Sequence, residues 1–256
     1  MIKTLLARFK QGYRTMPFPA DNNVLPERFL GRPAISDAFS AEERKKCEAV
    51  CPTGAISQRD SHSVIDLGKC LFCGECQKAC SNNAITFTRD YRLAVEDKSE
   101  LLIPKGSDSP AKKIKSKAGH IFGRSLKLRQ VSAGGCNACE SDINVLNTLS
   151  FDLGRFGIQF VASPRHADGM LVTGPVTKNM VLALEKTYAA IPSPKLVIAI
   201  GACAISGGPY IDHQEVNNGV DSMIPVDLYI PGCPPHPLTI LDGLIKVMRR
   251  KGIPLR

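Results

Sequence analysis

Two blocks of this chain resemble each other, and both are built around cysteine. The first covers residues 47–56 with the sequence CEAVCPTGAI, and the second covers residues 76–85 with the sequence CQKACSNNAI. Two further cysteines precede the second block and complete a C-x2-C-x2-C-x3-C run that begins at Cys70. Where the first block would need the same pair, the chain has Ala41 and Arg44. The chain therefore holds one complete and one depleted copy of a single motif.

The complete run has the spacing with which bacterial ferredoxins bind iron–sulfur clusters, and there the fourth cysteine of each run ligates the other cluster. The complete run therefore needs a fourth ligand from the depleted copy, where Cys51 is followed by Pro52. The predicted ligands of one [4Fe–4S] cluster are Cys51, Cys70, Cys73 and Cys76. The other site would retain only Cys47 and Cys80, and two thiolates do not hold a cubane. We expect that cluster to be lost and these two cysteines to be small core residues.

The composition restricts the classes of protein that fit. The chain has 256 residues, of which 43% are hydrophobic, which is enough for a core in one large or two small domains. It has no apolar run near the roughly 18 residues that span a bilayer, and no signal-peptide pattern. Ten cysteines in an unexported chain favour metal ligation over disulfides. The net charge of +9 favours an acidic partner, but without Trp or a recognised binding motif we expect no nucleic acid.

The first half of the chain divides into three expected segments. Residues 1–16 are predicted to form an amphipathic helix, able either to lie on a membrane or partner surface or to pack on its own domain. Its apolar positions are Ile2, Leu5, Leu6, Phe9 and Tyr13, and its basic positions are Lys3, Arg8, Lys10 and Arg14. Residues 17–103 are expected to form a ferredoxin-like iron–sulfur domain of the α+β class, which opens with a proline-rich extended connector over residues 17–36. Residues 104–123 are interpreted as a basic linker.

Residues 124–256 show a different pattern, in which short apolar runs alternate with helical ones. The predicted strands are Leu126–Val131, Ile158–Ala162, Met170–Thr173, Leu196–Ile200 and Leu228–Ile230. The predicted helices are Cys139–Ser150, Val176–Ile191 and Leu238–Arg250. This alternation predicts an α/β domain with a small, mostly parallel, doubly wound sheet of the flavodoxin-like kind.

The second half also contains four cysteines, each placed shortly after a predicted strand: Cys136, Cys139, Cys203 and Cys233. Because sites in open α/β sheets form at the carboxyl ends of strands, these loops are expected to converge. Four thiolates can then surround one [4Fe–4S] cluster, with nearby glycines leaving room and offering N–H groups to its sulfurs. Zinc held by four thiolates is the competing interpretation, and unligated buried cysteines are a third. A ferredoxin-like module on the same chain favours iron–sulfur.

Five segments of the second half resemble the small, cluster-bearing subunit shared by respiratory complex I, as its 20 kDa subunit, and membrane-bound energy-converting [NiFe] hydrogenases. They are GGCNACE (134–140), SPRHAD (163–168), TGPVT (173–177), GACAISGG (201–208) and VDLYIPGCPP (226–235). The resemblance implies that the four cysteines hold a [4Fe–4S] cluster beside a large catalytic subunit. Complex I subunits usually have adjacent cysteines in the first segment, whereas this chain has Cys136-x-x-Cys139-Glu140, which resembles the formate-hydrogenlyase branch.

Residues 1–103 resemble the two-cluster ferredoxin-like subunit of the same complexes, through the amphipathic start, the segment FLGRP (29–33) and the cysteine repeat. The resemblance implies an electron-transfer subunit with two [4Fe–4S] clusters, bound peripherally on the cytoplasmic side of a membrane. The implied partners are a large catalytic subunit, integral membrane subunits and an iron–sulfur electron donor. The first alternative is a complex-I-like subunit that serves quinone reduction, and a distant one is a zinc-stapled binding module.

Three further residues are candidates for a role near the second cluster. By analogy with hydrogenases, Glu140 is a possible proton relay, and a structural salt bridge is the equal alternative. Arg165 either favours a reduced cluster through its charge or pairs with Asp168. His166, in a loop beside the sheet, is expected to be structural.

Overall fold

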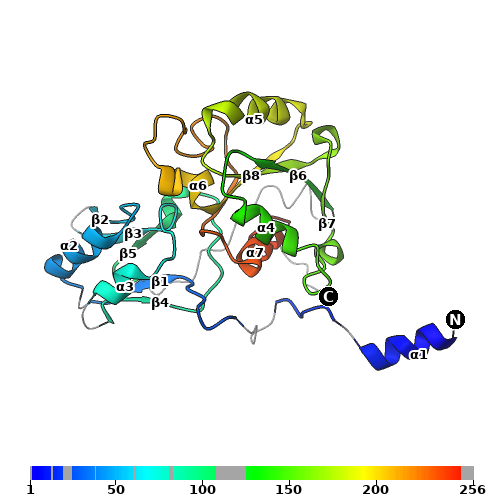
Figure 1. The fold of residues 1–256 in the computed structure, drawn as a ribbon, viewed down its shortest axis with the longest axis horizontal. Coiled ribbons are helices and arrows are strands. Elements are labelled where there is room, and N and C mark those ends of the chain that lie inside the picture. Colours follow the sequence, from blue (N-terminus) through cyan, green and yellow to red (C-terminus); the bar gives the residue numbers. More distant parts are fainter. Residues whose placement is uncertain are drawn as a thin grey trace.

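The structure, a computed structural model, describes residues 2–12, 14–19, 25–37, 39–59, 62–80, 83–107 and 125–248. Figure 1 shows two parts side by side, an N-terminal part in blue to cyan and a C-terminal part in green to red, with helix α1 standing apart. The two parts correspond to the two cysteine patterns of the sequence.

The C-terminal part is built on a five-stranded parallel sheet with the strand order β10-β9-β8-β6-β7. Its strands are β6 (Leu126–Ser132), β7 (Ile158–Phe160), β8 (Gly169–Thr173), β9 (Leu196–Ile200) and β10 (Leu228–Ile230). Read in chain order this is the 2-1-3-4-5 arrangement of flavodoxin-like sheets, in which sites form at the strands' carboxyl ends. The expected parallel α/β architecture is confirmed.

Helices cover both faces of this sheet, as Figure 1 shows. They are α4 (Ala138–Val145), α5 (Lys178–Ala190), α6 (Gly201–Ser206) and α7 (Pro237–Met248), joined by the short 3-10 helices η4 (Leu153–Phe156), η5 (Pro164–His166) and η6 (Gly208–Tyr210). The side chains of β8 alternate between the two resulting cores: Met170 and Val172 enter one, and Leu171 enters the other. Burial on both faces explains why these strands read as continuous apolar runs.

Helices α4 and α6 depart most from the sequence prediction in the C-terminal part. Helix α4 ends at Val145 rather than Ser150, because the chain tightens there into a bond from the Thr148 N–H to the Val145 carbonyl oxygen. The Thr148 hydroxyl donates to the same oxygen at 2.7 Å. Helix α6 was not predicted, since its six residues begin with Gly201, are followed by Gly207 and carry no helical periodicity.

The N-terminal part is a mixture of short helices and antiparallel strands. Strands β1 (Pro33–Ile35) and β4 (Ile85–Phe87) form one sheet, and β2 (Ile56–Arg59), β3 (His62–Asp66) and β5 (Leu102–Pro104) form another. Its helices are α2 (Ala41–Val50), α3 (Glu75–Ala79) and the 3-10 helix η2 (Lys98–Leu101). The internal repeat is visible in this order, because α2 is followed by β2 as α3 is followed by β4.

The N-terminal helix is shorter than predicted. Helix α1 (Ile2–Gln11) ends where Gly12 adopts a φ of +64° and its N–H bonds the Arg8 carbonyl oxygen at 3.1 Å, a common helix terminus. All its residues are exposed. The expected apolar position Tyr13 lies outside the described residues. Within the described ranges, no helix combines the length and the apolar character needed to cross a bilayer.

The predicted linker starts later than residue 104. Pro104 ends strand β5, and the Lys105 N–H bonds the Ser63 carbonyl oxygen at 3.0 Å, so the chain still belongs to the N-terminal part there. Residues 108–124 lie outside the described residues. The segment boundaries 1–16, 17–103, 104–123 and 124–256 otherwise stay a prediction.

The two parts pack against each other through α6 and β10. The Ser206 hydroxyl of α6 donates to the Gly68 carbonyl oxygen at 2.7 Å. Val95 pairs with Tyr229 in an antiparallel bridge that extends the edge of the C-terminal sheet. One hydrophobic cluster contains residues of both parts, so the parts share a core.

Candidate metal centres

Loops after three parallel strands bring four cysteines to one edge of the C-terminal sheet. The first pair, Cys136 and Cys139, follows β6, while Cys203 lies in α6 directly after β9 and Cys233 follows β10. A Cβ at Gly201, two residues before Cys203, would lie 2.6 Å from the Cys139 Sγ and 3.5 Å from the Gly232 carbonyl oxygen, so the three cysteine-bearing segments meet there. The convergence predicted from strand ends is therefore present in the structure.

Glycines make the room that this site needs. Gly201 has a φ of +88°, and a Cβ there would lie 2.6 Å from the Cys139 Sγ. Gly208 has a φ of +55°, and a Cβ there would lie 2.8 Å from the Cys203 Sγ. Larger residues would push against the sulfurs, so the backbone approaches the thiols in a way that only glycine allows.

The chemistry of these thiols fits a metal cluster. Burial first, and then Cys233 and Cys136, raise the pKa of Cys203 to about 12. Burial also raises the pKa of Cys233, followed by Cys136 and Cys73. A raised pKa favours the protonated thiol, whereas a bound metal core stabilises thiolates and releases their protons. A cationic core would therefore relieve the repulsion of four gathered thiolates.

Glu140 is buried beside Cys139 and is held by a hydroxyl. Its side chain is 6% exposed, and the Thr173 hydroxyl at the end of β8 donates to its Oε1 at 2.5 Å. Its negative charge contributes to the raised pKa of both Cys139 and Cys203. The hydrogen-bond donor to Glu140 is thus a threonine hydroxyl rather than the basic residue that a salt bridge requires.

The SPRHAD segment lies away from the cysteines. Arg165 and His166 are exposed in η5. Asp168 accepts a bond from the Lys127 N–H at 2.7 Å, at the amino-terminal end of β6. The segment therefore sits near the sheet edge opposite to the cysteines, which argues against a tuning charge at Arg165.

The N-terminal part gathers the other predicted ligands around a small cavity. Cys51 caps the carboxyl end of α2, while Cys76 lies in α3 and Cys70 and Cys73 precede it. All four line one cavity together with Pro52, Thr53, Ile65 and Phe87. The cross-ligation argument expected this convergence of Cys51 with the later run.

Backbone N–H groups point at these sulfurs. The Ala55 N–H donates to the Cys51 Sγ at 3.2 Å, and the Phe72 N–H donates to the Cys70 Sγ at 3.3 Å. Such bonds stabilise ligating thiolates and tune cluster potentials. Burial raises the pKa of Cys70 to about 12 and, with Cys51 and Cys73, that of Cys76 to about 11. This donor set fits a metal core for the same reason as the first.

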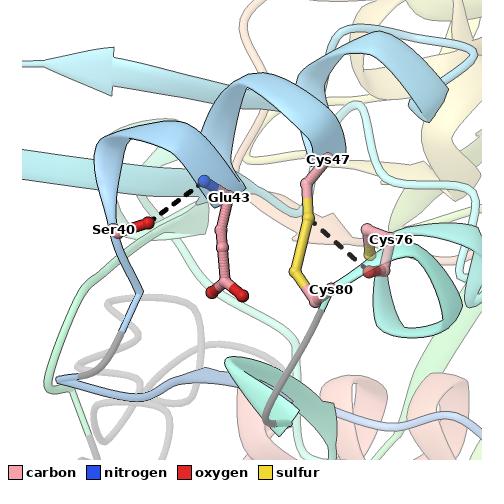
Figure 2. The surroundings of a disulfide bond; sticks show 5 residues. All are labelled: Ser40, Glu43, Cys47, Cys76 and Cys80. Carbon is pink, nitrogen blue, oxygen red and sulfur yellow. Dashed lines mark hydrogen bonds between the residues drawn. A yellow bond between two sulfur atoms is a disulfide. The ribbon is translucent and has the colours of Figure 1, made fainter.

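The two leftover cysteines form a disulfide, which the sequence interpretation did not anticipate. Cys47 is fully buried in the core, as expected, but its sulfur is bonded to that of Cys80. Figure 2 shows the bond between α2 and the end of α3. The expectation of metal ligation in place of disulfides therefore needs correcting for this one pair.

The two ligand sets lie close together. Cys73 of the N-terminal set contributes to the raised pKa of Cys233 in the C-terminal set, after burial and Cys136. Leu71 and Phe72, which lie between Cys70 and Cys73 in the chain, also line one cavity with Cys233, so the two groups of cysteines border the same space.

The sequence interpretation missed a cavity of about 500 Å³ between the two parts. Its lining is mostly aromatic, aliphatic and proline, and it includes Phe29, Phe72, Phe151, Cys233 and His236. His236 packs edge-on against Phe29 with ring centroids 5.2 Å apart, and burial lowers its pKa. The segment FLGRP, whose Phe29 and Leu30 line this cavity, was the sequence signal that could have pointed to it.

Comparison with known proteins finds matches in both parts of the chain. Residues 136–247 match the family model of the NADH ubiquinone oxidoreductase 20 kDa subunit, and residues 63–86 match the 4Fe-4S binding domain. The probable membrane-bound hydrogenase subunit mbhJ of Pyrococcus furiosus is 39% identical over 147 residues, which cover 56% of this chain and 88% of that protein. Formate hydrogenlyase subunit 7 of Escherichia coli is 40% identical over 151 residues, which cover 59% of each.

Among solved structures, a chain of the membrane-bound sulfane sulfur reductase, an archaeal respiratory membrane complex, is similar at 38% identity. The TM-score is 0.45, and the match covers 51% of this chain and 72% of that chain. The chain belongs to the family of the NADH ubiquinone oxidoreductase 20 kDa subunit, the iron–sulfur electron-transfer subunits of membrane-bound hydrogenase and complex-I-like oxidoreductases, and carries a 4Fe-4S binding segment ahead of it.

Proposed function

We propose that this chain is a two-cluster electron wire for a membrane-associated, energy-converting [NiFe] hydrogenase of the formate-hydrogenlyase kind. One [4Fe–4S] cluster is held by Cys51, Cys70, Cys73 and Cys76. The other is held by Cys136, Cys139, Cys203 and Cys233. Each cluster takes up and gives away single electrons.

The observation that carries this proposal is that Leu71 and Phe72, which lie between Cys70 and Cys73 in the chain, line one cavity together with Cys233. Clusters that only stabilise the fold do not need to lie near each other, whereas electron transfer between clusters requires a short distance. Ser206, Gly68 and the Val95–Tyr229 bridge fix the two parts around this cavity. The residues of the chain thus hold two redox centres at short range without needing a mobile carrier.

The exposure of Cys136 supports a direction for electron transfer. Cys136 is exposed, whereas Cys203 is buried. An exposed cluster edge suits docking of a large catalytic subunit, and the probable hydrogenase subunit mbhJ and formate hydrogenlyase subunit 7 are named as subunits of such enzymes. We therefore place the catalytic subunit on the Cys136 side and the electron donor on the ferredoxin-like side.

The large subunit, integral membrane subunits and an iron–sulfur donor complete the proposed assembly, on the cytoplasmic side of the membrane. Glu140 is the proposed proton carrier between this chain and the catalytic subunit, because it is buried beside a ligand and bonded to a rotatable hydroxyl. Replacing Glu140 with Gln should then slow proton-linked turnover while the iron content of the chain stays unchanged.

The second candidate is a complex-I-like subunit that serves quinone reduction, favoured by the match of residues 136–247 to the 20 kDa subunit model. The form Cys136-x-x-Cys139-Glu140 favours the hydrogenase branch. An assembled complex with nickel and hydrogen turnover that is insensitive to quinone analogues supports the first candidate. A nickel-free complex with quinone-dependent turnover would move the assignment to the second.

The first experiment is metal analysis of the chain purified without oxygen. Two complete sets of ligands predict about eight iron atoms and about eight acid-labile sulfides per chain. About twelve iron atoms would show that the depleted site also holds a cluster. Near-stoichiometric zinc with little iron would refute the electron-transfer function and favour a binding module that is stabilised by structural zinc.

A further inference from the structure

In the depleted copy of the cysteine motif, Arg44, Cys47 and Cys80 make contacts with other protein side chains. Arg44, at one of the two missing ligand positions, turns to the side and pairs with Glu48 at 3.2 Å, and it also donates to the Gln58 Oε1 of β2. The other missing position, Ala41, opens helix α2 and has no donor side chain. The two surviving cysteines are joined to each other.

The surviving sulfurs differ in access. Cys47 is fully buried, whereas Cys80 is partly exposed where α3 ends. Their Cα atoms are 6.4 Å apart, within the range that a disulfide spans. An incoming reagent therefore meets the Cys80 sulfur before that of Cys47.

A reduced pair would also be accommodated. The Cys47 Sγ lies 3.6 Å from the Cys76 carbonyl oxygen, to which a thiol at this position can donate. The same oxygen accepts the Cys80 N–H at 3.0 Å. Loss of the disulfide thus leaves the Cys47 sulfur with a polar partner, and that partner belongs to a proposed ligand of the retained cluster.

The pair connects the two segments that supply the N-terminal ligand set. Cys47 lies one helical turn before Cys51, and Cys80 lies one turn after Cys76, as Figure 2 shows for the side of α3. A bond between Cys47 and Cys80 therefore keeps Cys51 beside the run that carries the other three ligands.

We propose that Cys47 and Cys80 form a reversible thiol–disulfide site that takes low-molecular-weight disulfides and, when oxidised, holds the ligand set of the retained cluster together. The Cys80 sulfur attacks the small disulfide and releases one thiol, which leaves a mixed disulfide on Cys80. The Cys47 sulfur then displaces the second thiol and forms the Cys47–Cys80 bond. Two electrons and two protons pass from the pair to the small disulfide, and excess small thiol reverses both steps.

The first test maps the pair in the intact, cluster-loaded chain without any variant. The chain is equilibrated with glutathione disulfide and glutathione at a series of ratios, then alkylated and analysed as peptides. We expect a linked Cys47–Cys80 peptide that grows with the ratio and disappears when glutathione is returned. Absence of that peptide at every ratio, or linkage through one of the proposed ligands, would overturn the proposal.

A pair of matched variants tests the order of attack. In Cys47→Ala, the partly exposed Cys80 should accumulate as a mixed disulfide with glutathione. In Cys80→Ala, the buried Cys47 should stay unmodified over the same time. Equal modification of the two variants would contradict the assigned roles of attacking and resolving sulfur.

The last test measures cluster retention and rests on the proposed function of the ligand set. Iron release to a chelator is followed for the wild-type chain with its pair oxidised or reduced. Iron release should be several-fold slower when the pair is oxidised. The Cys47→Ala/Cys80→Ala chain should release iron in both conditions as fast as the wild-type chain does when its pair is reduced. Equal rates in the two wild-type states would refute the holding role. About eight iron atoms with an inert pair would refute this inference while leaving the electron wire intact.

Discussion

At the residue scale, Gly201 shows how tightly the sequence is restricted around the second cluster site. Its φ of +88° is costly for other residues, and an added Cβ would stand 2.6 Å from the Cys139 Sγ. Gly201→Ala should therefore displace a ligand and lower the iron content from about eight to about four per chain. Gly154→Ala is the control, because the nearest atom to a Cβ there, the Asp152 Oδ1, is 3.9 Å away. An unchanged iron content in Gly201→Ala would show that the glycine is dispensable.

The raised thiol pKa values predict a pH dependence that separates the metal-free chain from the loaded one. Burial raises the pKa of Cys70 from about 9 to about 12 in the folded chain. Above about pH 9 the unfolded chain loses this proton first, so the metal-free chain should lose stability as pH rises towards about 12. In the loaded chain the ligating thiols carry no proton, and this loss should be absent. Denaturant unfolding of both forms at about pH 7 and about pH 10 measures the difference.

At the scale of elements, α2 is fixed at both ends by its own sequence. Ser40 caps its start by accepting the Glu43 N–H at 3.1 Å, and Cys51 caps its end. Ser40→Ala should cost about 1 kcal/mol of stability and loosen the segment that carries Cys51. Thr187→Ala in α5 is the control, since its hydroxyl only bonds the Ala183 carbonyl oxygen within the helix. Thermal unfolding compares the two, and an equal loss would argue against the cap.

The elements that could be predicted were those whose sequence signal is local and repeated. Strands β9 and β10 matched their predicted bounds because both faces are buried and the runs are apolar throughout. The ends of α1 and α4 were missed, since Gly12 and the tightened turn near Thr148 act through single hydrogen bonds. The two ligand sets followed from spacing and strand order, but the Cys47–Cys80 bond did not, because spacing cannot show which thiols face each other.

At the scale of the whole molecule, the two parts share one hydrophobic cluster. Their hydrophobic cluster is continuous, and Gly68 packs so closely on α6 that an added Cβ would lie 2.8 Å from the Ile205 Cγ2. Gly68→Ala should therefore strain the contact between the parts, change the electronic coupling of the two clusters and leave each cluster present. Electron paramagnetic resonance of the fully reduced chain reports the coupling, and iron analysis reports the clusters. Loss of iron in this variant would show instead that Gly68 is needed to keep one of the clusters bound.

Attachment of the whole molecule to a membrane is expected to involve the exposed helix α1. Helix α1 exposes Ile2, Leu5, Leu6 and Phe9, the last with 85% of its surface accessible, and it contributes nothing to either core. Its basic residues add roughly 1 kcal/mol each near an anionic lipid surface, but one short helix binds reversibly. Most of the hold should therefore come from partner subunits.

Leu5→Ser/Phe9→Ser should weaken binding to anionic vesicles and loosen the assembled chain from its membrane, while both clusters remain. The control is Lys45→Ser, which removes an exposed positive charge from α2. It should change vesicle binding far less, because it leaves the apolar face of α1 intact. Vesicle sedimentation of the isolated chain separates lipid binding from binding to partners, because high salt should release it from vesicles but release little of the assembled complex from native membranes. Recovery of the intact assembled chain wholly in the soluble fraction of gently lysed cells would contradict placement at the membrane.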